Sequence, residues 1–135
     1  MILSRTAIYA LRVLTLLGRA APAENLTAAR LSSGASVPRH YVNKVMQQLV
    51  AAGIVSATRG QGGGFQLARP PRRVRFADVL AAVNMDLQIG QCVFRAGPCR
   101  TSDPCILHAA WSELQERVDD WARRTTLADL DTTAP

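Results

Sequence analysis

Acidic side chains are almost missing from the first 75 residues of this 135-residue chain. That segment holds eleven Lys and Arg residues and a single acid, Glu24, for a net charge of +10. Residues 76–135 hold five Arg and nine acids, for a net charge of −4. A half this basic should attract a polyanion, and double-stranded DNA is the partner we expect. The alternative is a basic surface that serves only solubility.

Long apolar runs and histidines are also scarce. No apolar stretch approaches 18 residues without a charge, so a transmembrane helix and a membrane partner are excluded. The N-terminal apolar run loosely imitates a signal peptide, but Arg12 interrupts it, and we expect a cytoplasmic protein. Histidine occurs only at positions 40 and 108, which leaves little for catalysis, so we do not expect an enzyme.

Cysteine occurs only in one 17-residue window, with the spacing C-x6-C-x5-C-x2-H. The residues are Cys92, Cys99, Cys105 and His108. Thiolates and imidazole bind zinc, copper(I) or iron–sulfur clusters, and the Gly and Pro residues between them predict a loop able to fold around a metal. A disulfide would leave one thiol over, and inert buried cysteines would not lie among Gly, Pro, Arg and Asp. The spacing predicts a metal site without separating zinc from iron–sulfur.

Two helices are predicted at the start of the chain. Ser4 caps the first, which Gly18 can end, and Thr27 caps a second over residues 28–33 that Gly34 stops. The apolar face of the first helix comprises Ala7, Ala10, Leu11, Leu14 and Leu17.

A third helix opens at Ser36 and Pro38 and ends at Gly53. Its predicted buried stripe is Val42, Val45, Met46, Leu49 and Val50. Its outward row is Arg39, His40, Asn43, Lys44 and Gln47. A short helix, a turn and a helix with an outward polar row are typical of a helix-turn-helix.

A glycine-tipped hairpin follows, formed by residues 54–58 and 65–68 around the turn at 59–64. The turn lacks the patterns of nucleotide-binding loops, so we interpret the hairpin as the wing of a winged helix. The recognition helix should meet the major groove, and the wing should reach the minor groove. The predicted DNA-binding residues are Arg39, His40, Tyr41, Asn43, Lys44 and Arg59.

A connector at residues 69–75 leads to a fourth helix marked by Phe76, Val79, Leu80 and Val83. A last helix over about 104–124 carries a heptad-like seam. The seam is Leu107, Trp111, Leu114, Val118 and Trp121. It indicates either an ordinary core helix or a dimer helix, and we favour the dimer helix because a small winged helix usually reads two half-sites as a pair.

The predicted fold is therefore mainly α with a small β-hairpin. A winged helix-turn-helix domain at residues 1–75 precedes a metal-binding loop and a long dimerisation helix at residues 76–135.

The chain resembles the IscR/NsrR superfamily of bacterial winged-helix regulators (the Rrf-two superfamily) over nearly its whole length. The stretches that carry the resemblance are residues 4–10, 41–49, 53–56, 59–65 and 92–108, with Trp111. Family members with such cysteines are homodimeric transcriptional regulators that bind a [2Fe–2S] or [4Fe–4S] cluster. They sense iron–sulfur status, redox state, oxygen or nitric oxide.

The resemblance also implies a ligand set. IscR-like members use a histidine three residues after the last cysteine, the position of His108, whereas NsrR-like members can recruit an acid from the partner's first helix. Residues 1–23 contain no acid, and position 8 is Ile8. We therefore expect Cys92, Cys99, Cys105 and His108 to hold a cluster, with [2Fe–2S] favoured and [4Fe–4S] as the alternative, in a homodimer on a palindromic operator. The rival functions are a DNA-binding protein with a structural Cys3His zinc site and a small electron carrier or cluster-transfer protein.

Overall fold

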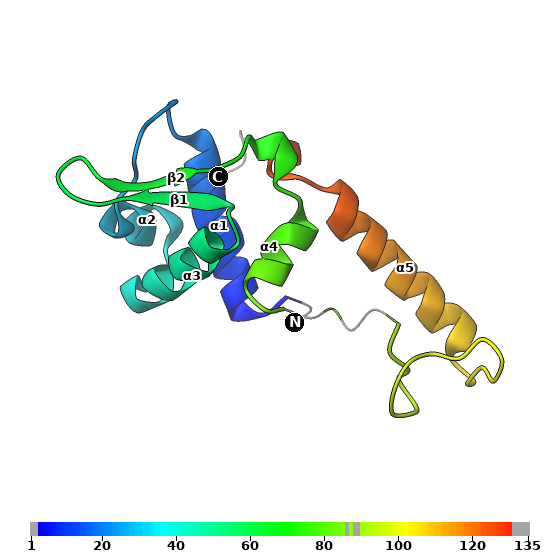
Figure 1. Cartoon of the computed structure of the whole chain (residues 1–135). Helices are drawn as coiled ribbons and strands as arrows, with labels where there is room; N and C mark the ends of the chain where they lie inside the picture. The colour runs from blue at the N-terminus through cyan, green and yellow to red at the C-terminus, as the bar shows by residue number, and fades with distance from the viewer. Residues whose placement is uncertain (1–2, 86, 88–89, 131–135) are drawn as a thin grey trace.

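The computed structural model describes residues 3–85, 87 and 90–130, and it confirms a mainly helical chain with one small hairpin (Figure 1). The elements in chain order are α1 Arg5–Arg19, α2 Ala28–Ala35, α3 Arg39–Ala51, β1 Val55–Thr58, β2 Gly64–Leu67, the 3-10 turn η1 Pro71–Arg73, α4 Phe76–Ala82, α5 His108–Arg124 and the 3-10 turn η2 Leu127–Asp129. Among the described residues, no helix combines the length and apolarity needed to span a membrane.

The predicted caps of α1 and α2 are confirmed. The Ser4 hydroxyl accepts from the backbone N–H of Ala7, and the Thr27 hydroxyl accepts from that of Arg30. The predicted stop at Gly34 is wrong, because α2 continues to Ala35 and Ser36 turns the chain with φ of +53°. A Cβ at Gly34 would lie 2.8 Å from the Leu16 side chain, so glycine permits close packing of α2 on α1.

Ser36 therefore ends α2 rather than opening α3, which begins after Pro38. The end of α3 is a Schellman motif: Gly53 (φ +74°) donates to the Val50 carbonyl, and Ile54 donates to the Leu49 carbonyl. The predicted stripe of α3 is buried except for Val50, which is 38% exposed. Val42, Val45, Met46 and Leu49 share one side of the helix, and Val50 lies about 100° around the helix from Leu49, outside that side.

The hairpin forms as predicted, with β1 antiparallel to β2 and Val55 opposite Leu67. Strand β2 is held to the body by Leu26, which exchanges backbone hydrogen bonds with Phe65 at 3.0 and 2.9 Å. Gly64 has φ of +143°, and a Cβ there would lie 2.7 Å from the Leu26 carbonyl oxygen. Only glycine therefore allows this close approach.

The predicted fourth helix is confirmed as α4, whose Phe76, Val79 and Leu80 are buried. The hydrophobic core includes α1, α2, α3 and α4, and it also takes in Ala122 and Leu127 from the C-terminal part. One core thus runs through both predicted segments of the chain.

The last helix begins at His108, four residues after the predicted start at Pro104. Residues 101–107 form turns instead, and the backbone N–H of His108 bonds to the Cys105 carbonyl. Helix α5 then projects away from the body and carries the cysteine loop at its far end (Figure 1).

Gly64→Ala tests how the wing is attached. We expect it to lower the free energy of unfolding by on the order of 2 kcal/mol, because the added methyl meets the Leu26 backbone. Gly60→Ala is the control: Gly60 also has positive φ, but a Cβ there has open space, and only about 1 kcal/mol of backbone strain is expected. Equal losses in urea unfolding would show that the Leu26 contact does not constrain the wing.

Candidate functional site

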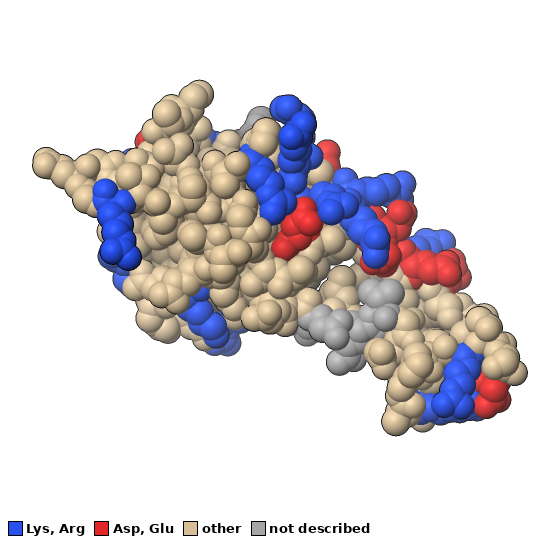
Figure 2. All heavy atoms as spheres, viewed as in Figure 1, with Lys and Arg blue, Asp and Glu red and all other residues tan. Residues whose placement is uncertain are grey.

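The outward row of α3 is exposed as predicted. Arg39, His40, Asn43 and Lys44 are all exposed, and Arg59 stands exposed at the start of the hairpin turn. On the face shown in Figure 2, most acidic side chains lie over α5 and the loop beyond it, away from the hairpin. The helix-turn-helix and the wing therefore form a continuous part of the surface that is poor in acids.

Tyr41 differs from its neighbours because it is half-buried. Its ring meets the Tyr9 ring edge-on, with centroids 5.0 Å apart, and the His40 ring lies 4.7 Å away. Arg12 of α1 lies over the Tyr9 ring at 5.9 Å. These contacts fix the first turn of α3 against α1, and they limit how the Tyr41 ring can move.

The predicted metal ligands lie in a loop closed by its own backbone. Cys92 donates its N–H to the Gly97 carbonyl at 3.0 Å, and Cys99 donates to the Gly90 carbonyl at 2.6 Å. Gly97 turns this short double-stranded segment with φ of +95°. The fold therefore places Cys92 and Cys99 at the two sides of one narrow loop.

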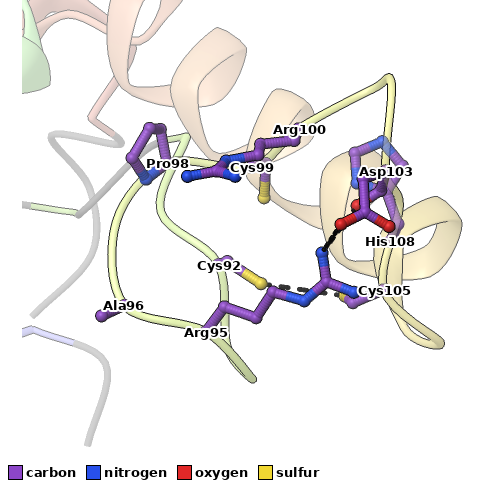
Figure 3. A pocket seen from close by; sticks show the side chains of 9 residues that line it. All are labelled: Cys92, Arg95, Ala96, Pro98, Cys99, Arg100, Asp103, Cys105 and His108. Carbon is purple, nitrogen blue, oxygen red and sulfur yellow. Dashed lines mark hydrogen bonds and ion pairs between the residues drawn. The ribbon is translucent and has the colours of Figure 1, made fainter.

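All four predicted ligands line one cavity of about 190 Å³, with Cys92, Cys99 and Cys105 coming from the loop and His108 from the first residue of α5 (Figure 3). The Cys92 and Cys105 sulfurs are 3.8 Å apart. Two thiolates bound tetrahedrally to one metal at about 2.3 Å would be separated by about 3.8 Å. These two residues are therefore spaced for a shared metal ion.

The four ligands do not close around a single point. Within the described parts of the chain, no three His, Cys, Asp or Glu side chains stand close enough to hold one metal ion. The Cys99 sulfur instead lies 3.5 Å from the Gln91 carbonyl oxygen. The structure thus gathers the donors in one cavity, with one pair at ligand spacing.

Positive charge and backbone N–H groups surround the thiols. The Phe94 N–H, which bonds to the Cys92 sulfur, lowers the pKa of Cys92, and the Arg95 N–H and guanidinium act in the same direction. Burial raises the pKa of Cys99, and the neighbouring Cys92 and Cys105 add to this rise. Arg95 and Arg100 both line the cavity, which suits an anionic group.

Arg95 also ties the loop together. Its Nη1 donates to the carbonyl oxygen of Asp103 at 2.9 Å and to the Asp103 carboxylate at 2.6 Å (Figure 3). This pair spans the loop between Cys92 and Cys105. Both side chains are about half exposed, so the pair fixes loop geometry more than it stabilises the fold.

Two contacts between the loop and α5 were not predicted from the sequence. Trp111 donates its indole N–H to the Gln91 carbonyl at 2.8 Å, and Gln115 donates its amide to the same oxygen at 3.2 Å. Gln115 is only 7% exposed. The available signal was weak: Gln115 lies four positions after Trp111 and seven before Ala122, so the three residues share one face of the helix.

The predicted seam on α5 is largely uncovered. Leu114 is 51% exposed and Trp121 is 40% exposed, whereas Gln115 and Ala122 are buried. At about 100° per residue, Leu114 and Trp121 fall on one strip, and Gln115 and Ala122 fall on another about 100° away. The second strip faces the chain's own body and loop. The first, outward strip exposes Leu114 and part of Trp121, whose ring also packs edge-on against Phe76 of α4.

Comparison with known families gives a match over residues 3–132 to the Rrf2 family, described as an iron-dependent transcriptional regulator. Among curated proteins, the chain is 31% identical over 102 residues to the HTH-type transcriptional regulator IscR of Xenorhabdus nematophila. The match covers 76% of this chain and 62% of that relative. These relatives are named as regulators, in agreement with the expectation that the chain is not an enzyme.

Solved structures show the same fold. CymR, the global cysteine regulator of B. subtilis, superposes with a TM-score of 0.82 at 19% identity, covering 98% of each chain. IscR of T. potens superposes with a TM-score of 0.74 at 19% identity, covering 94% of this chain and 83% of that one. At these identities the likeness establishes the winged-helix architecture.

Proposed function

The chain belongs to the Rrf2 family of winged helix-turn-helix transcriptional regulators, and we propose that it binds an operator as a homodimer. We further propose that its cysteine loop holds a cluster through which it senses redox state, nitric oxide or iron–sulfur status. The observation that carries the proposal is the gathering of Cys92, Cys99, Cys105 and His108 around one cavity.

The chemistry of the donors fits an iron–sulfur cluster. Cysteine thiolates hold iron–sulfur clusters, and histidine replaces thiolates in some of them. Two arginines of the cavity lining offset the negative charge of the thiolates. The spacing of Cys92 and Cys105 suits two ligands on one metal, and the other two donors lie around the same cavity. The matched family model, described as an iron-dependent transcriptional regulator, favours an iron–sulfur cluster over a single zinc ion. When bound, a cluster supplies a group that changes charge and ligation with redox state.

We assign Cys92, Cys99 and Cys105 as the fixed ligands and His108 as the exchangeable one. A neutral imidazole can be protonated and leave, whereas a thiolate holds its metal more firmly. His108 is also the first residue of α5, so its release would act directly on the start of that helix. The favoured group is [2Fe–2S].

The DNA interface is assigned to α3 and the wing. We propose that the exposed residues Arg39, His40, Asn43 and Lys44 enter a major groove, and that Arg59, also exposed, enters an adjacent A·T-rich minor groove. We include Tyr41 as a residue that contacts the DNA backbone and holds His40 in place.

The homodimer is assigned to the outward strip of α5. Large exposed apolar side chains, including Leu114 and Trp121, recur along one helix, which is unusual for a face left in water. A second copy of α5 packed on the outward strip would cover Leu114 and the exposed part of Trp121, and a twofold dimer would read two half-sites of a palindromic operator.

Ligand variants test the cluster assignment. Cys99→Ala should abolish visible absorption, whereas His108→Ala should leave a less stable cluster. His108→Cys should lower the reduction potential, because a fourth thiolate adds negative charge. His40→Ala, which removes the chain's other histidine, is the control and should leave spectrum and potential unchanged.

Absorption spectra, iron and sulfide analysis and redox titration of anaerobically reconstituted variants provide the measurement. If His108→Ala and His108→Cys both matched the parent, the assignment of His108 as a ligand would be wrong.

Arg59→Ala tests the wing. We expect operator binding to weaken by about 1–3 kcal/mol, with the loss concentrated on operators that carry an A·T-rich flank. Arg123→Ala removes the same charge from the face of α5 opposite the seam and should leave affinity nearly unchanged. Fluorescence anisotropy measures the operator affinity of both variants. Equal affinities for Arg59→Ala and the parent would show that the wing does not contact the operator.

Leu114→Lys tests the dimer. A lysine on the outward strip should raise the dimer dissociation constant by about a hundredfold or more, because its charge would be buried without a partner. Glu116→Lys adds the same side chain on the opposite side of α5, and it should remain dimeric. Analytical ultracentrifugation at micromolar concentration distinguishes the two, and a dimeric Leu114→Lys would contradict the assigned interface.

A further inference from the structure

The backbone carbonyl of Gln91 is the meeting point of the cysteine loop and α5. It accepts from the Trp111 indole at 2.8 Å, from the Gln115 amide at 3.2 Å and from the Cys99 thiol at 3.5 Å. A carbonyl oxygen has two lone pairs, so three donors compete for it. Two of the three come from α5 and one from a predicted metal ligand.

Gln91 occupies a position that controls the loop geometry. It immediately precedes Cys92, and it pairs across the loop with Pro98, which immediately precedes Cys99. Backbone hydrogen bonds on either side of this pair connect Cys92 to Gly97 and Cys99 to Gly90. A shift of the Gln91 carbonyl must therefore move two of the predicted ligands together.

The α5 side of this contact is built from residues one turn apart. Trp111 and Gln115 are separated by four positions, so both point to the same side of the helix. A buried amide is costly unless its hydrogen bonds are made, and Gln115, which is 7% exposed, makes one to the Gln91 carbonyl. Leu114, on the outward strip, lies between them in sequence.

The geometry assigns Trp111 and Gln115 as positioning residues that couple the state of the cysteine loop to the dimer helix through the Gln91 carbonyl. This assignment rests on the proposed function. Gln91 and Pro98 pair across the loop and each immediately precedes a predicted ligand, so a metal that drew Cys92 and Cys99 together would also shift the Gln91 carbonyl. Trp111 and Gln115 hold that carbonyl from α5. The contact between α5 and the loop would therefore differ between the metal-bound and metal-free states.

The experiment uses Trp111→Phe, which keeps a ring but removes the N–H, and Gln115→Met, which keeps length but removes the amide. Glu116→Met is the matched control: Glu116 is exposed and lies about 100° around α5 from Gln115, away from the loop contact. The DNA probe is a duplex selected from random sequence with the parent protein. For each variant, cluster content and the ratio of DNA affinities with and without the cluster are measured anaerobically.

We expect both variants to assemble the cluster, and each to reduce the ratio about fivefold, the effect of one hydrogen bond. Glu116→Met should keep the parent ratio. A merely structural role would weaken DNA binding equally in both states, and the ratio would not move.

Three results would overturn the assignment: a parent ratio in both Trp111→Phe and Gln115→Met, an equal fall in Glu116→Met, or loss of the cluster in both variants. Failure of the proposed function is seen separately, in the parent protein. A parent that binds no cluster, or whose affinity ignores it, overturns that proposal and this one together.

Discussion

The docking of the C-terminal end of α5 onto α4 is the contact on which the rest of the structure depends. Phe76 and Trp121 meet edge-on at 5.2 Å, the Phe76 N–H bonds to the Thr125 carbonyl at 2.9 Å, and Leu127 bonds to Val74 at 3.0 Å. Because the cysteine loop lies at the opposite end of α5, this joint sets where the loop stands relative to the DNA-binding body (Figure 1). A change at the loop can reach the body through the helix and this joint.

The joint is linked in turn to the recognition helix. Asp78, in the first turn of α4, pairs with Arg69 at 3.7 Å, and Arg69 donates to the carbonyls of Ala52 and Gly53 at the end of α3. Cations are favoured at a helix C-terminus, so Arg69 stabilises α3 while it contacts α4. The recognition helix α3 is therefore connected to α5: Arg69 contacts both the end of α3 and α4, and α4 supports α5.

The cysteine loop has little apolar core of its own. Phe94 is 61% exposed and Ile106 is 95% exposed, so these large side chains contribute little burial within one chain. The loop is held by backbone pairs, the Arg95–Asp103 tie and the Gln91 contacts. In such a segment, metal binding would supply much of the free energy of ordering, which makes the loop suited to reporting whether a metal is present.

Local patterns sufficed to predict much of this structure. Hydrophobic periodicity identified the buried face of α4 and most of that of α1, where it missed the buried Val13 and included the half-buried Leu11. The glycine-rich turn identified the wing. Errors arose where tertiary packing matters. Gly34 lies inside α2, where its missing side chain lets Leu16 pack closely, and α5 starts at His108 because turns precede it at residues 101–107. The hydrogen bonds from Trp111 and Gln115 to the Gln91 carbonyl could not be predicted from the sequence, because every residue has a backbone carbonyl and the residue type does not show which one is bound.

The most direct test of the account is the metal content of the chain purified without oxygen, measured together with operator binding on the same sample. The account predicts iron and acid-labile sulfide in equal amounts, close to two of each per chain for the favoured [2Fe–2S] form, and an operator affinity that changes when the cluster is removed. Stoichiometric zinc without sulfide, and an affinity indifferent to metal removal, would contradict it.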